Sequence, residues 1–161
     1  MVKVFISHQV GDSSIANKIE RYLRGAYGIE SYLDTIDPTI QNGEDLAEYI
    51  RSQLTNCTQL LAVVSEKTQE SWWVPWEIGV ASEKNYPLAT YAEGSSLLPE
   101  YLRKWPYLRN EKDLDYYAQV SKKSKSSTAS LKRRMGSESN SNTNINSTRE
   151  FYNDLRRKLG Q

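Results

Sequence analysis

The sequence predicts an α/β fold, in which an open parallel sheet is covered by helices on both faces. Short apolar runs alternate with segments whose apolar residues recur at helical spacing, which is typical of such folds. Residues 60–64 are all apolar, as expected for a parallel strand that is buried on both sides. A chain of 161 residues with 38% hydrophobic side chains is the size of one domain with one core.

Strands are expected at residues 2–6, 29–34, 60–64 and 88–91. A fifth strand is harder to place, because residues 105–108 are the only candidate and are few. Parallel α/β sheets bind their ligands at the carboxyl ends of the strands. Ser7, Asp34 and Ser65 fall at those ends, so we expect a ligand cleft beside them.

Helices are expected in the segments between these runs. Residues 15–26 and 44–54 carry apolar side chains at helical spacing. The next helix is expected to begin near Val74, because Pro75 fits the first helical position, where an N–H has no partner in any case. Glu77 would then lie in the first turn of that helix.

Large apolar residues almost disappear in the C-terminal third, where Ser, Asn, Lys and Arg dominate. Such a composition buries too little apolar surface to order the chain, so we expect a flexible surface loop there. Ser147 begins a capping box, and Phe151, Leu155 and Leu159 behind it form an apolar stripe that can dock on the sheet. The chain would thus consist of a domain, a flexible loop and a docked helix, at residues 1–120, 121–147 and 148–161.

Composition and charge limit the expected partners. A formal net charge of +1 gives no general attraction to nucleic acid. No apolar run approaches the ~20 residues that a membrane span needs, and no leader-like pattern follows Met1. We therefore expect a cytoplasmic protein with neither a membrane nor a nucleic-acid partner. The single Cys57 and single His8 cannot build a disulfide or a zinc site, so no metal is expected.

Glu77 is the strongest candidate for chemistry, because it closes a run that contains Trp72, Trp73 and Trp76. Breaking an N-glycosidic bond makes the sugar carbon cationic, and a fixed carboxylate beside that carbon stabilises the cation. A leaving group that is already cationic needs no general acid. The alternative is structural: Glu77 would stabilise a helix N-terminus by up to about 1 kcal/mol, and the tryptophans would belong to the core or an interface.

Taken together, these segments resemble the TIR domain family. Residues 4–8 resemble the family's first box, residues 28–34 its second strand and residues 37–43 its BB loop. Residues 60–65 resemble its third strand, and residues 71–77 resemble the tryptophan–glutamate motif of its NAD-consuming branch. Five boxes in the same order are more specific than any one of them. By order and spacing the resemblance extends over residues 2–117.

The resemblance implies a flavodoxin-like fold and a catalytic role for Glu77. It also implies substrate contacts from Ser7, His8, Asp34, Ile40, Gly43 and Trp73. Trp73 would pack beside the ribose–nicotinamide end, and Ser7 and His8 would line the cleft. Asp34, Ile40 and Gly43, which lie on or before the BB loop, would shape the mouth of the cleft.

The resemblance also implies that the protein is an enzyme that cleaves the nicotinamide–ribose bond of NAD⁺. NAD⁺ would be its substrate rather than a recycled cofactor. Family members often assemble through the BB loop, so self-assembly is expected. With no effector domain on this chain, it looks like the bacterial anti-phage type found in Thoeris systems. There the TIR protein makes an ADP-ribose-derived signal, such as a cyclic isomer or a conjugate, for a separate effector protein.

Two other functions stay open at this point. Residues 76–81 also resemble nucleoside deoxyribosyltransferases, in which Glu77 would keep its role and only the substrate would change. A non-catalytic adaptor that assembles with other TIR domains is the second. Adaptor members of the family lack the glutamate motif, which favours an enzyme.

Overall fold

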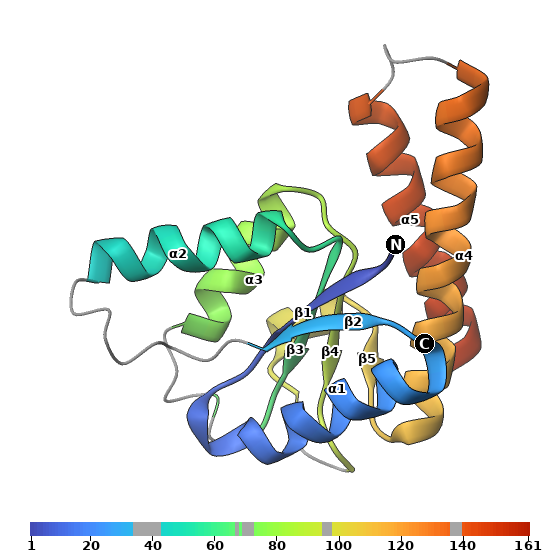
Figure 1. Cartoon of the computed structure of the whole chain (residues 1–161). Coiled ribbons are helices and arrows are strands. Elements are labelled where there is room, and N and C mark those ends of the chain that lie inside the picture. The colour runs from blue at the N-terminus through green and yellow to red at the C-terminus, as the bar shows by residue number, and fades with distance from the viewer. Residues whose placement is uncertain (34–42, 67, 69–72, 95–97, 136–139) are drawn as a thin grey trace.

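The sheet is open, and all of its strands run parallel in the order β2-β1-β3-β4-β5 (Figure 1). The structure is a computed structural model that describes residues 1–33, 43–66, 68, 73–94, 98–135 and 140–161. Its strands are β1 Lys3–Ser7, β2 Glu30–Leu33, β3 Gln59–Val63, β4 Leu88–Tyr91 and β5 Tyr107–Leu108. This architecture confirms the predicted fold class.

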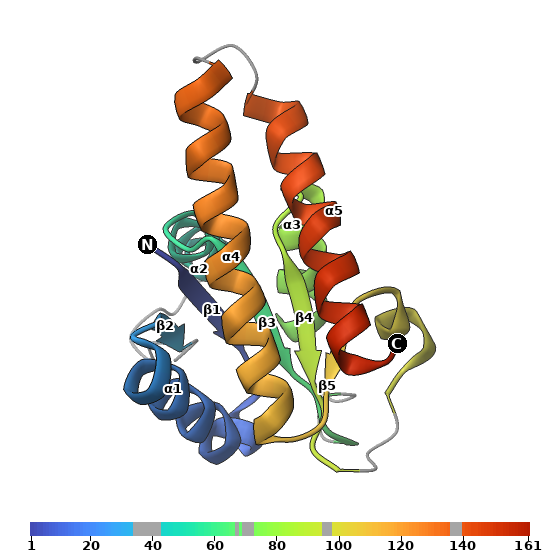
Figure 2. The ribbon, with the colours of Figure 1, turned by 90° about the vertical axis from the view of Figure 1, so that its right-hand side faces the viewer.

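Helices connect successive strands in the described parts of the chain. The helices are α1 Ser13–Tyr27, α2 Gly43–Thr55, α3 Trp73–Glu83, α4 Glu111–Met135 and α5 Asn140–Leu159. Two 3₁₀ segments, η1 and η3, cover Val10–Asp12 and Glu100–Lys104. Figures 1 and 2 show α2 and α3 on one face of the sheet and α1, α4 and α5 on the other.

Each face of the sheet has its own apolar layer, because successive residues of a strand point to opposite sides. Val4 and Ile6 of β1 pack in the layer with α1, α4 and α5. Phe5, between them, packs in the layer with α2 and α3. Every residue of β3 is buried, which explains why that strand reads as a continuous apolar run.

The structure contradicts the flexible loop expected over residues 121–147. Helix α4 continues to Met135, and α5 begins at Asn140 rather than at the capping box of Ser147. The physical reason is that a helix pair needs only one apolar stripe on each partner. Tyr117 of α4 and Phe151 of α5 belong to these apolar stripes and anchor the two helices near the sheet. The polar residues beyond them then extend helices that are already anchored. Figure 2 shows them side by side.

The apolar stripe expected at the C-terminus does lie against the sheet. Phe151 and Leu155 of α5 are buried, and Leu159 is partly buried against the same layer. The ring of Phe151 meets Tyr117 of α4 edge-on, with 6.1 Å between ring centroids. On the outside of the pair, the Lys123 ammonium lies 2.7 Å from the Asp154 carboxylate.

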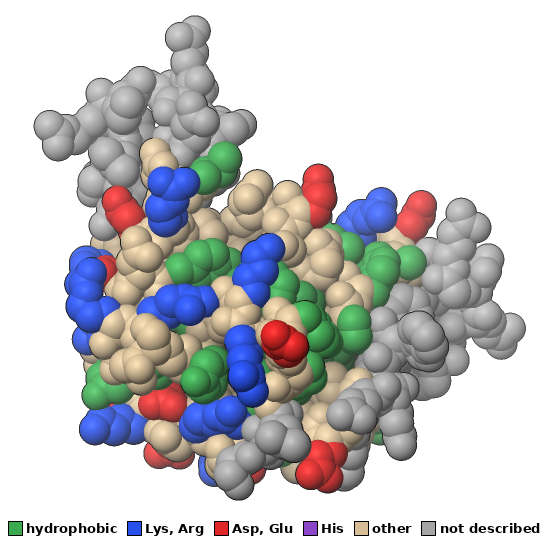
Figure 3. All heavy atoms as spheres, turned by 180° about the vertical axis from the view of Figure 1, so that it is seen from behind, with side chains coloured by type: hydrophobic (Ala, Val, Ile, Leu, Met, Phe, Trp, Pro, Cys, Tyr) green, Lys and Arg blue, Asp and Glu red, His purple; other side chains and the backbone are tan. Residues whose placement is uncertain are grey.

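The described surface is mixed in character. Figure 3 shows basic, acidic and apolar side chains interspersed on the face seen from behind. Among the described helices, none combines the length and apolar composition needed to cross a bilayer.

Candidate active site

Strand β1 and helix α3 together place a buried carboxylate at the carboxyl edge of the sheet. Ser7 is the last residue of β1 and Glu77 belongs to α3. The Ser7 hydroxyl donates a hydrogen bond to Oε2 of Glu77, across 70 positions of sequence. Both side chains are 0% exposed. A carboxylate without water is expensive to bury unless it is hydrogen-bonded, so this contact fixes where Glu77 points.

Glu77 does not lie in the first turn of its helix, as the sequence analysis expected. Helix α3 begins at Trp73, and its first turn contains no acidic residue. Pro75 is tolerated there because the first four N–H groups of a helix have no intrahelical acceptor, so its missing N–H costs nothing. Glu77 therefore sits one turn in, away from the helix end. Glu77 is therefore not a solvent-exposed charge that stabilises the N-terminus of the helix.

His8 follows Ser7 and is only 7% exposed, which differs from a solvated loop histidine. Its Nδ1 lies 3.2 Å from the carbonyl oxygen of Ile6. A carbonyl can only accept, so Nδ1 carries a proton in this contact. The imidazole is thereby held by the backbone of β1, next to the Ser7–Glu77 contact.

Asp12, Ser65 and Thr68 form a second polar cluster, of which only Ser65 was expected beside the cleft, from its place at a strand end. Asp12 is 3% exposed, and its Oδ2 accepts a hydrogen bond of 2.8 Å from the Ser65 hydroxyl. The N–H of Ser65 donates to Oγ1 of Thr68 at 2.8 Å. This cluster ties the loop after β1 to the loop after β3, beside which Glu77 lies.

Sequence spacing gave little reason to join these residues. Asp12 occupies the N-cap position of α1, yet its side chain makes no cap bond there. Its partner Ser65 lies 53 positions away. The available signal was only that Ser65 falls at a strand end in a parallel sheet, where such ends meet.

The remaining predicted site residues are placed by the structure only in part. Asp34 and Ile40 lie outside the described residues. Gly43 and Trp73 are described as the first residues of α2 and α3, respectively, by their backbone alone. Trp76 is half-buried and packs on the apolar layer of α2 and α3, as a core residue does.

A carboxylate held in one orientation at a sheet edge can stabilise a nearby cation or accept a proton. Within the described parts of the chain, no three His, Cys, Asp or Glu side chains converge as metal ligands do. We therefore assign no residue here to a metal ion.

Comparison with known proteins gives a family match over most of the chain. A family model described as a TIR domain matches residues 4–133, and so extends beyond the domain boundary expected at residue 120. A curated relative is named probable 3' cyclic ADP-D-ribose synthase ThsB' of Bacillus cereus (strain MSX-D12). It is 28% identical over 80 residues, which cover 47% of this chain and 41% of that protein. The match thus spans less than half the length of the relative.

Two solved structures show the same fold at low identity. The TIR domain of the Toll-related receptor TRR-2 from Hydra magnipapillata is 18% identical, with a TM-score of 0.55, over 70% of this chain and 87% of that chain. A prokaryotic SEFIR domain is 15% identical, with a TM-score of 0.53, over 76% of this chain and 91% of that chain.

Proposed function

Because the chain belongs to the TIR domain family, we propose that it cleaves the nicotinamide–ribose bond of NAD⁺, with Glu77 as the catalytic carboxylate. The observation that carries the proposal is the buried Glu77 carboxylate, oriented by the Ser7 hydroxyl at the carboxyl edge of the sheet. The similarity to a protein named as a probable cyclic ADP-D-ribose synthase supports NAD⁺ as the substrate.

In the proposed reaction the bond between C1′ of the ribose and the pyridinium nitrogen breaks. The nitrogen keeps the electron pair, so nicotinamide leaves as a neutral molecule and needs no proton. The ribose is left as an oxocarbenium-like cation, which the Glu77 carboxylate stabilises. Water, or a nucleophile within the same ADP-ribose, then bonds to C1′ and loses a proton. Capture by water gives ADP-ribose, and capture by the internal nucleophile gives a cyclic ADP-ribose isomer.

Substrate access is part of the proposal. Glu77 and Ser7 have no exposed surface, so NAD⁺ reaches them only after this edge of the sheet rearranges. We propose that self-assembly through the BB loop at residues 37–43 drives the rearrangement. Among the residues named by the family resemblance, Ser7 would position Glu77 through its hydroxyl. Substrate contacts would come from the others: His8, Asp34, Ile40, Gly43 and Trp73.

The proposed biological role is supported by the same relative and by the resemblance to the TIR proteins of Thoeris systems. We propose that the product is an ADP-ribose-derived signal, read by a separate effector protein in anti-phage defence. This part depends on the partial match to the Bacillus cereus protein and is independent of the role of Glu77.

The substrate is tested by incubating the purified chain, under crowded conditions that favour assembly, with NAD⁺ and separately with deoxynucleosides. We expect nicotinamide release from NAD⁺ and no base release from deoxynucleosides. Mass spectrometry of the NAD⁺ products distinguishes ADP-ribose from a cyclic ADP-ribose, which has the mass of ADP-ribose less one water. Base release from deoxynucleosides alone would replace the proposal with a deoxyribosyltransferase.

A further inference from the structure

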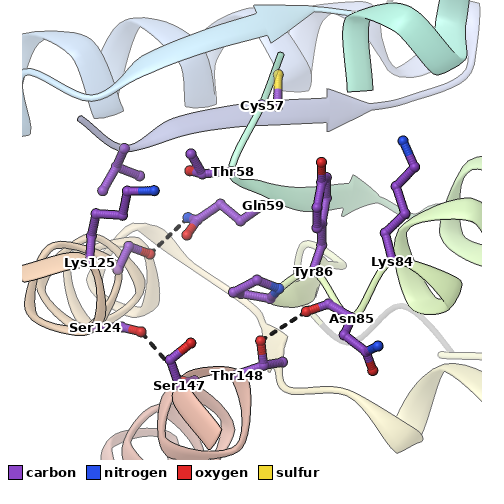
Figure 4. A pocket seen from close by; sticks show the side chains of 13 residues that line it. Cys57, Thr58, Gln59, Lys84, Asn85, Tyr86, Ser124, Lys125, Ser147 and Thr148 are labelled. Carbon is purple, nitrogen blue, oxygen red and sulfur yellow. Dashed lines mark hydrogen bonds between the residues drawn. The ribbon is translucent and has the colours of Figure 1, made fainter. Parts of the chain in front are cut away.

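A cavity of about 240 Å³ opens at the amino edge of the sheet, opposite the edge that holds Glu77. Its lining includes Gln59, the first residue of β3, and Pro87, which precedes β4. Side chains of α4 and α5 close it from the other side (Figure 4). A strand of five residues spans about 15 Å, so this cavity is separate from the proposed NAD⁺ site.

The amide of Gln59 presents an acceptor to this cavity. Its side chain is 3% exposed, and its Nε2 lies 2.6 Å from the Tyr117 hydroxyl and 2.8 Å from the Ser121 hydroxyl. Ser121 already donates its proton to the Tyr117 carbonyl at 2.7 Å, so its oxygen must accept from Gln59. This fixes the amide with nitrogen toward α4.

The other end of the amide, Oε1 of Gln59, has no hydrogen-bond partner among the described residues. Figure 4 shows this oxygen pointing into the cavity. This oxygen is not one of the buried polar atoms that lack a partner, so it is accessible from the cavity and can accept a hydrogen bond. An N–H group of a bound molecule would satisfy it.

The charge in the cavity is positive. Lys84 and Lys125 are the charged residues of its described lining, and no Asp or Glu belongs to it. Lys84 donates to the Thr55 hydroxyl at 2.7 Å. Lys125 is exposed at the rim and has no carboxylate partner among the described residues. A bound molecule should therefore carry an anionic group near Lys125.

The walls are held in place before any ligand arrives. Thr148 of α5 donates a hydrogen bond of 2.9 Å to the carbonyl of Asn85, which adopts a left-handed φ of 54°. This bond joins α5 to the turn between α3 and β4. The rings of Tyr86 and Pro87 line the space beside that turn and offer apolar surface to a planar ring.

We propose that this cavity binds a mononucleotide with an exocyclic amine on its base, such as AMP. The amine would donate to Oε1 of Gln59, the base would lie along Tyr86 and Pro87, and the phosphate would meet Lys125. A volume of about 240 Å³ is just below the roughly 300–1,000 Å³ of ordinary ligand pockets. This volume suits one base with its ribose, and the phosphate would extend to Lys125 at the open rim.

Isothermal titration calorimetry with AMP tests this site directly. We expect AMP to bind, and two matched ligands to bind at least about tenfold more weakly. Adenosine lacks the phosphate, and purine riboside 5′-monophosphate lacks only the amine that Gln59 would accept from. The second ligand tests Gln59 without a substitution in the core.

Protein variants locate the binding. Lys125→Glu should weaken AMP binding at least about tenfold, whereas Lys18→Glu, an equal charge change on the exposed face of α1, should leave it within about twofold. Glu77→Gln should bind AMP like the wild type, whatever its activity toward NAD⁺. Absence of AMP binding at millimolar concentration, binding unaffected by Lys125→Glu, or binding lost in Glu77→Gln would each overturn the proposal.

Discussion

At the scale of residues, the proposed catalytic role of Glu77 depends on the hydrogen bond that it receives from Ser7. A buried carboxylate that receives a hydroxyl proton is both tolerated and oriented. We therefore propose that Ser7 is a positioning residue, whereas the family resemblance implies that it contacts the substrate. These two roles have different kinetic consequences, because positioning affects the transition state more than substrate binding.

Replacing Ser7 by Ala should therefore lower kcat for NAD⁺ cleavage about tenfold and leave KM within about twofold. Ser7→Thr, which restores a hydroxyl, should recover most of the loss. Ser14→Ala, at an exposed position of α1, is the matched control. Initial rates over a range of NAD⁺ concentrations measure both constants. A rise in KM with unchanged kcat would instead assign Ser7 to substrate binding.

At the scale of elements, helix α4 is fastened to α1 by a cluster of hydroxyls and a carboxylate. Tyr22 and Tyr27 of α1 donate hydrogen bonds of 2.5 and 2.7 Å to Oδ1 of Asp115. These bonds hold the pKa of Asp115 below its ordinary value. The hydrogen bond to the charged Asp115 also raises the pKa of Tyr22 to about 12.

A carboxyl group whose pKa is lower in the folded state adds stability above its unfolded pKa, and this stability is lost as the pH falls through the folded pKa. Asp115→Asn should accordingly lower the Tm by a few degrees at pH 7. The difference from wild type should shrink below about pH 4. Circular dichroism melts at several pH values measure it, with Glu150→Gln on the exposed side of α5 as control. An equal loss of Tm at every pH would contradict the linkage.

The elements also show where sequence reasoning succeeds and where it fails. Strands β1, β3 and β4 begin and end within one residue of the predicted runs, since a strand covered on both faces must be apolar along most of its length. Strand β2 also lies within one residue of the predicted segment, although it is only partly buried. Residues 121–135 were missed because composition averages over a window, whereas a helix needs only a narrow stripe. Tyr117 and Val120 of α4 belong to that stripe and lie just before the polar stretch begins.

At the scale of the whole molecule, one parallel sheet gives the chain two chemically different edges. The carboxyl edge holds the carboxylate of Glu77, and the amino edge holds a cavity with an amide acceptor and two ammonium groups. The position of each edge could be inferred from strand order along the chain. The contacts at each edge join residues 53 to 70 positions apart, and only the folded chain reveals them.

The role of Glu77 in breaking the glycosidic bond of NAD⁺ is tested by measuring nicotinamide release by wild type and by Glu77→Gln under crowded conditions. Glutamine keeps the size of the side chain and an oxygen that can accept from Ser7. We expect the rate to fall by about 100-fold or more, while Glu83→Gln, at an exposed position of the same helix, stays near wild type. A Glu77→Gln protein that is folded and releases nicotinamide at the wild-type rate, or a wild type that releases none, would contradict the account.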